Sequence, residues 1–208
     1  MKKRRLKTWP IIILLIFIIL ILCIISIIKS LNGNKKVSTE TIDTIKNYNY
    51  NLNQKESSYY KSLFKELKKV LSSKNVDEEK YASIISKMFL TDFLSLDNAI
   101  NKNDIGGLDF VYESYLETFK TKAQDTLYLY VENNIYGDRK QELPVVSNVK
   151  VNNIRTNSYN GNKEQDEKAY YVNCSISYKK DLGYPKSVEL ILIHKNNKLE
   201  IVSMKWKF

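Results

Sequence analysis

The side chains that most often carry out catalysis are scarce in this chain. Its single histidine, His194, falls at the end of a predicted strand beside a hairpin, where a polar strand-end residue is the ordinary interpretation. The sequence contains no G-x-S-x-G, P-loop or G-x-G-x-x-G motif. Cys23 lies in an apolar run and Cys174 in a predicted strand, an arrangement that excludes a disulfide between them and a cysteine-based zinc site. The sequence therefore predicts no catalytic, cofactor or metal site, and a protein that is not an enzyme.

The segment from Asn101 to Gly106 has a superficial similarity to a calcium-binding loop. Oxygen donors stand at its first and third positions, and glycine stands at its sixth. However, Ile105 occupies the fifth position and Tyr112 the twelfth, where calcium loops need an oxygen donor and a carboxylate. We therefore expect a turn between two helices, with glycine supplying a positive φ.

Tyrosine is unusually frequent, with fifteen residues in the chain. Tyrosine and tryptophan combine a large contact area with a polar tip, so a face rich in them can form a pocket or a partner surface. Ordinary packing in the core and in the sheet is the alternative explanation for most of these aromatic residues. The candidates for a pocket or an interface are Phe89, Phe93, Tyr115, Phe119, Tyr170, Tyr178 and Trp206.

An apolar segment near the start predicts a membrane anchor over residues 10–29. Residues 11–28 contain Ser26 as their one polar side chain. A helix of this length spans about 27 Å, close to the thickness of the bilayer hydrocarbon. A cleaved signal peptide normally has a shorter apolar region followed by small residues, a pattern that this sequence lacks. We expect an uncleaved helix that contacts the lipid bilayer through residues 10–29.

The distribution of charge predicts how this anchor is oriented. Five basic residues precede the segment, so the positive-inside rule places residues 1–9 in the cytoplasm as a basic tail and the domain outside it. The formal net charge is +10, but residues 30–208 hold 27 basic against 23 acidic side chains. Without a basic face, this small excess argues against nucleic-acid binding.

The remaining sequence predicts a polar stalk followed by one α+β domain. Residues 30–56 have little apolar periodicity and form the predicted stalk, with a partly helical stretch expected after Ser38. Helical spacing of apolar residues is then replaced by the period of two that is typical of strands. Helices before strands predict that residues 57–208 form two or three helices packed on a curved antiparallel sheet of about four strands. The predicted helices cover residues 60–71, 81–96 and 116–131; the strands begin at 149 and continue over 170–178, 188–194 and 199–208, with a loop over 158–167.

This order of elements, with the closing hairpin KSVELILIHKNNKLEIVSMKW, resembles the nuclear-transport-factor-2-like, or cystatin-like, α+β cone. An N-terminal anchor followed by one such domain is similar to the bitopic scaffold subunits of conjugation and type IV secretion systems. The resemblance covers residues 57–208 and implies a non-catalytic role in assembly through protein contacts. The carboxylate-histidine dyad found in enzymes of this family is not expected here.

We therefore expect a single-pass cell-membrane protein whose extracytoplasmic domain is an interaction or scaffold module of a bacterial envelope complex. A protein partner or self-association in the membrane is implied. The alternative is a small-ligand-binding or sensory domain that uses a pocket inside the cone.

Overall fold

The computed structural model describes residues 17–21, 40–162 and 164–207. The chain divides into two compact units, residues 1–38 and residues 39–208, and the second contains the domain. Residues 17–21 are helical, whereas the rest of the predicted membrane segment over 10–29 lies outside the described residues. Within the described ranges, no helix has both the length and the apolar character needed to cross a membrane.

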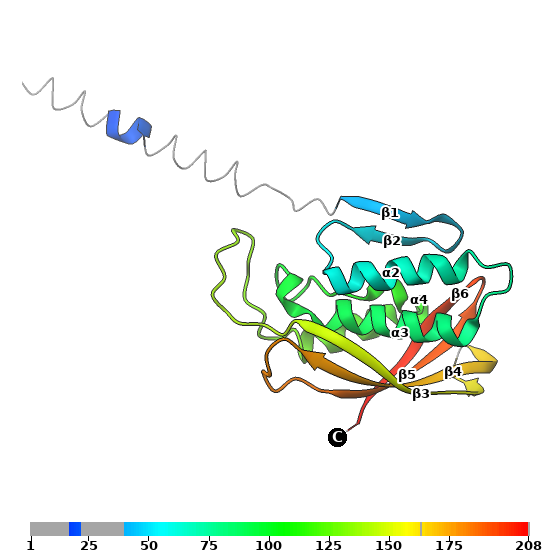
Figure 1. Cartoon of the computed structure of the whole chain (residues 1–208). Coiled ribbons are helices and arrows are strands. Elements are labelled where there is room, and N and C mark those ends of the chain that lie inside the picture. Colours follow the sequence, from blue (N-terminus) through cyan, green and yellow to red (C-terminus); the bar gives the residue numbers. More distant parts are fainter. Residues whose placement is uncertain (1–16, 22–39, 163, 208) are drawn as a thin grey trace, which may run out of the picture. The chain divides into compact units, whose positions relative to one another are not determined.

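The domain is α+β, as predicted, and is built on a four-stranded antiparallel sheet (Figure 1). The strands are β3 (Val146–Asn160), β4 (Gln165–Tyr178), β5 (Ser187–Lys195) and β6 (Lys198–Trp206), and they lie side by side in chain order. The hairpin between β5 and β6 turns at Asn196, whose φ of 53° is the positive value expected for this position. Because the strands are neighbours in sequence, β3 and β6 form the two edges of the sheet.

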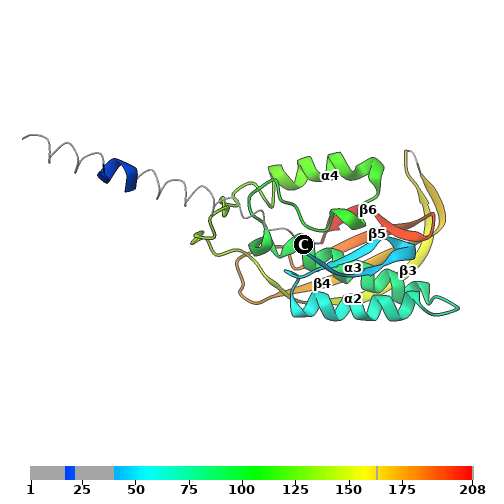
Figure 2. The same cartoon turned by 90° about the horizontal axis from the view of Figure 1, so that it is seen from above.

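Three helices, α2 (Ser58–Leu71), α3 (Glu78–Leu94) and α4 (Glu113–Asp125), follow the predicted order. The side chains of Ser57 and Asp77 cap α2 and α3 by accepting hydrogen bonds from backbone N–H groups of the first turn. Figure 1 shows α2 and α3 together on one face of the sheet, with α3 nearer to the strands. Buried side chains surround most of α3, and Figure 2 shows α3 between α2 and α4, so it is the central helix of the domain.

The predicted stalk over residues 30–56 is incorrect in its described part. Residues 40–56 belong to the compact unit and contain a hairpin of β1 (Thr41–Ile45) and β2 (Tyr50–Asn53). Figure 1 shows this hairpin beside the helices, away from the sheet. Tyr50 and Leu52 alternate toward the core, and the Tyr50 hydroxyl lies 2.7 Å from the Tyr81 hydroxyl of α3. Two inward side chains are too few to give a recognisable alternation of apolar and polar residues. The hairpin could therefore not be predicted from the sequence, and it is recognised by its contact with α3.

The predicted loop over residues 158–167 is also corrected, because β3 and β4 continue through most of it as a long hairpin. The polar side chains of this extension are largely exposed on both faces, so the sequence lacks an apolar alternation there. Backbone pairing such as Asn160 with Gln165 maintains the strands instead.

The third helix ends at Asp125, six residues before the predicted end at residue 131. After α4 the chain turns, and Tyr128 enters the core, where its hydroxyl donates to the Phe93 carbonyl at 2.7 Å. A buried tyrosine in a turn gives the same apolar signal as a tyrosine on a helix, which explains the overlong prediction.

Candidate functional site

The predicted aromatic pocket at Phe89, Phe93 and Phe119 is part of the packed core. Phe89 and Phe93 on α3 are fully buried, and their rings stack 5.4 Å apart. Phe119 on α4 covers both rings at 5.9 and 5.0 Å. These contacts attach α4 to α3, and they fill the place where the sequence suggests a ligand.

The other four aromatic candidates lie apart from one another, with Tyr115 on α4, Tyr170 and Tyr178 on β4, and Trp206 on β6. The Tyr115 hydroxyl lies 3.3 Å from that of Tyr159, and the Tyr178 hydroxyl donates to the Pro185 carbonyl. Trp206 pairs with Val188 at the end of β6 and packs partly buried against the core. Tyr170 reaches the start of α3, where its hydroxyl donates to Glu78 at 3.3 Å. The seven residues therefore do not converge on one site.

The predicted turn after α3 is confirmed, and its oxygen atoms bind the backbone. Asn101 Oδ1 accepts from the Asn103 N–H, and Asp104 Oδ2 accepts from the Ile100 N–H. Gly107 supplies a positive φ of 76°. Among the described residues, no group of three or more His, Cys, Asp or Glu side chains is placed to hold a metal ion.

The fold does bring His194 close to two carboxylates, which come from different elements. Asp166 Oδ2 accepts from the His194 N–H at 2.7 Å and lies 2.8 Å from His194 Nδ1. His194 Nε2 lies 3.3 Å from Glu78 Oε2. This carboxylate-histidine pair forms because β4 and β5 place Asp166 and His194 together near the end of β5, where the His194 side chain is partly exposed.

This cluster connects the sheet to the N-terminus of α3. Burial, together with the negative charge of Glu78, raises the pKa of Tyr170 to about 12. Burial acts to raise the pKa of Asp166, but hydrogen bonds from the His194 and Lys168 N–H groups and from the His194 ring leave it below its usual value. Since both ring nitrogens of His194 face carboxylates, the imidazole serves as a bridge between β4 and α3.

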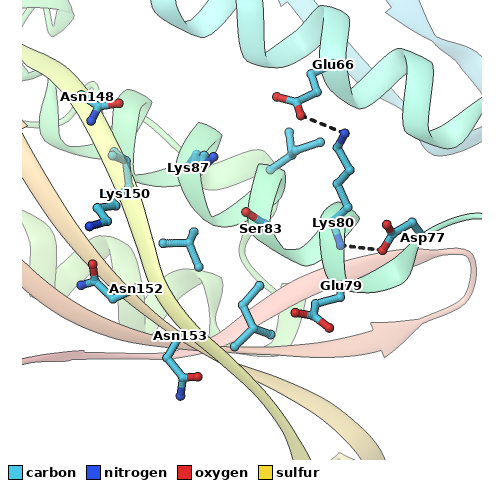
Figure 3. Close-up of a pocket in the computed structure, with 14 residues that line it drawn as sticks. Glu66, Asp77, Glu79, Lys80, Ser83, Lys87, Asn148, Lys150, Asn152 and Asn153 are labelled. Atoms are coloured by element: carbon cyan, nitrogen blue, oxygen red, sulfur yellow. Dashed lines mark hydrogen bonds and ion pairs between the residues drawn. The ribbon is translucent and has the colours of Figure 1, made fainter.

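A groove of about 900 Å³ lies between α3 and the edge strand β3 (Figure 3). Apolar side chains of Ile84, Val149, Val151 and Ile154 line part of it. Charged and hydroxyl side chains of α3 form one rim, and amide side chains of β3 form the other. The remaining lining residues are Glu66, Asp77, Glu79, Lys80, Ser83, Lys87, Asn148, Lys150, Asn152 and Asn153.

A bulge in β3 explains why these particular residues line the groove. Val151 pairs with Cys174 and Asn153 pairs with Asn173, so Asn152 is an extra residue between them. The simple alternation that begins at Val149 and Val151 therefore shifts by one residue, and Ile154 is the next apolar side chain in the groove. The side-chain amide of Asn152 donates a hydrogen bond to Ser175 Oγ of β4 at 2.7 Å.

The two edge strands of the sheet, β3 and β6, are contacted by different parts of the chain. The β6 edge is covered by the segment before α4, because Val111 pairs with Ile201 and the Tyr112 N–H donates to the Ile201 carbonyl. On the β3 edge, the Tyr59 hydroxyl of α2 accepts from the Val149 N–H at 3.0 Å and donates to the Val149 carbonyl at 3.2 Å. Tyr59 thus takes the place of a neighbouring strand at Val149, which shows that the backbone groups of this residue point away from β4.

Charges are separated along the groove. Because the Val146 N–H donates to Ser95 near the C-terminal end of α3, whereas Tyr170 of the adjoining strand reaches Glu78 at its start, β3 runs antiparallel to α3. In Figure 3, Lys87 lies toward one end and Glu79 lies toward the other end, whereas the Lys150 side chain extends from the opposite face of β3. Lys80 is paired with Glu66 at 3.3 Å, but Lys87, Lys150 and Glu79 have no ion pair among the described residues.

In comparisons with protein-family models, curated proteins and solved structures, none matches this chain. The site therefore has to be interpreted from its own geometry. An edge strand beside a groove with an apolar floor and polar rims can accept an extended polypeptide through backbone hydrogen bonds.

Proposed function

We propose that this protein is a membrane-tethered, non-catalytic interaction module that joins an envelope complex through its extracytoplasmic domain. The observation that carries the proposal is the contrast between a packed interior and an open sheet edge. Phe89 and Phe93 fill the centre of the domain, whereas β3 borders a groove of about 900 Å³. Such an arrangement suits recognition of another polypeptide better than enclosure of a small ligand.

The sequence supplies the membrane and assembly parts of the proposal. Residues 10–29 form the expected tether, with residues 1–9 in the cytoplasm. The resemblance to nuclear-transport-factor-2-like scaffold subunits of conjugation and type IV secretion systems supports an assembly role. The α+β architecture of residues 39–208 is compatible with that resemblance.

Chemical cross-linking of the full chain in the membranes of its own cell tests this function. We expect a defined complex with another membrane or envelope protein at native abundance, and we expect a reporter fused after Phe208 to be active outside the cytoplasm. A matched chain in which residues 11–28 are replaced by a polar linker should lose both the membrane location and the complex. Recovery of the monomer alone, or a reporter active in the cytoplasm, would contradict the proposal.

A further inference from the structure

We infer that the groove beside β3 binds an extended segment of a different protein, which adds to the sheet edge and places an acidic side chain beside Lys87. This inference rests on the proposed function and names the chemistry of the partner. It is carried by three features: the accessible part of the β3 edge, the separated charges of the groove, and the composition of β3.

The accessible part of the edge is short and well defined. Tyr59 occupies the backbone groups of Val149, so the stretch that borders the groove beyond it runs from Lys150 to Ile154. At about 3.3 Å per residue, this stretch is about 13 Å long and matches a partner segment of roughly five residues. The bulge at Asn152 twists this part of the edge, which disfavours open-ended pairing with many chains and favours a single short segment.

The charges define which side chains the segment carries. Lys87 attracts a carboxylate at one end of the groove, and Glu79 attracts a basic side chain at the other. Side chains four residues apart on a strand point to the same face, so an acidic and a basic residue at this spacing reach both ends together. An apolar side chain between them faces Val151 and Ile154 on the floor.

A second copy of this chain does not supply such a segment from its own edge. β3, residues 146–160, contains Lys150 and Arg155 but no aspartate or glutamate. A second β3 strand would therefore bring no carboxylate to Lys87, so pairing of two such edges lacks the charge complementarity that the groove offers. The charge pattern points to a different protein as the occupant.

The test uses the full chain in the membranes of its own cell, with a photo-reactive benzoylphenylalanine placed either at Asn153 in the groove or at Glu117 on α4. Glu117 is highly exposed and lies outside the groove, so it reports contacts made elsewhere on the domain. The cross-linked residue of each adduct is mapped by mass spectrometry. We expect the Asn153 adduct to map to an extended segment of another protein with an acidic and a basic residue about four positions apart.

The variant Lys87→Glu then tests the charge. We expect its adduct yield at Asn153 to fall at least about tenfold, because attraction of the acidic side chain becomes repulsion. The matched control, Lys102→Glu, changes the net charge equally at an exposed position outside the groove and should leave the yield unchanged. Thermal unfolding of both variants shows whether the fold is retained. If Lys87→Glu unfolds, Lys87→Gln, which removes the charge without reversing it, provides the charge test and should also lower the yield.

Exchange of the mapped acidic residue for lysine in the partner should restore the adduct of the Lys87→Glu variant. An adduct at Asn153 that is insensitive to the reversal, or that maps to a second copy of this chain, would overturn the inference. Adducts from Glu117 without any from Asn153 would also overturn it while leaving the proposed function intact. No adduct from either position would count against both.

Discussion

At the scale of single residues, the domain contains a buried carboxyl group, that of Glu56, which has no ion pair among the described residues. Glu56 is 8% exposed and lies near the half-buried Asp92. Burial, reinforced by the negative charge of Asp92, raises the pKa of Glu56 from its usual 4.5 to about 7. The folded protein therefore retains a proton at Glu56 that the unfolded chain releases above its lower pKa.

This difference predicts that Glu56→Gln stabilises the protein at high pH. Between about pH 4.5 and pH 7 the wild-type domain should lose stability as pH rises, by an amount on the order of 3 kcal/mol for this one group. The variant should lack this loss, so its gain over the wild type should appear by pH 8 and disappear near pH 4. Urea unfolding across this pH range measures the effect.

Glu167→Gln removes an exposed carboxyl group of the same type and is the matched control. It should leave the pH profile of unfolding unchanged. A Glu56→Gln profile that runs parallel to the wild-type profile from pH 4 to pH 8 would show that Glu56 is not the group responsible.

At the scale of elements, the turn between α3 and α4 depends on Gly107. Gly107 has a φ of 76°, and its N–H donates to Asp92 Oδ2 at 2.7 Å. A Cβ atom at this position would lie 2.9 Å from a ring carbon of Phe89, closer than real Cβ contacts. The turn is therefore packed directly onto the aromatic core of α3.

We expect Gly107→Ala to destabilise the domain by more than about 2 kcal/mol, because backbone strain adds to overpacking against Phe89. Gly183→Ala is a close control, because Gly183 has a φ of 77° and its Cβ would meet nothing within 4 Å. The control should lose only the stability that a positive φ costs a residue with a Cβ atom, about 1 kcal/mol. Chemical denaturation of the two variants gives the difference, and equal losses would contradict the packing argument.

At the scale of the whole domain, the β1–β2 hairpin is an integral part of residues 39–208. Tyr50 and Leu52 are 2% and 5% exposed, and the Tyr81 hydroxyl contacts the Tyr50 hydroxyl while accepting from the Leu199 N–H. The Asn197 side chain of the β5–β6 turn also donates to the Asn47 carbonyl. Hairpin, central helix and sheet therefore meet around Tyr81.

A fragment of residues 57–208, the domain as the sequence predicts it, should therefore be less stable than residues 39–208. Loss of the buried Tyr50 and Leu52 side chains alone removes about 3–5 kcal/mol of stabilisation. Urea unfolding of the two fragments measures this difference. Within residues 39–208, Tyr50→Ala should cause much of the loss, whereas Ile42→Ala on the exposed side of β1 should have little effect. Equal stability of the two fragments would show that the hairpin is dispensable.

Local periodicity was sufficient to predict the α+β class, the order of the helices and the three later strands. The apolar stripe of α2 and the alternation of β4 reflect the backbone geometry of each element, which acts over a few residues. The turns at Asn196 and Gly107 were predictable for the same reason, because a positive φ favours asparagine and glycine wherever they stand.

Tertiary structure alone decided the hairpin over residues 41–53, the bulge at Asn152 and the groove beside β3. Each depends on contacts between segments far apart in the chain, such as Tyr59 with Val149 and Glu78 with His194. A side chain carries no local signal of the partner that it will meet 90 or 116 residues away. The sequence thus determined which elements form, and the packing of those elements determined which side chains share a site.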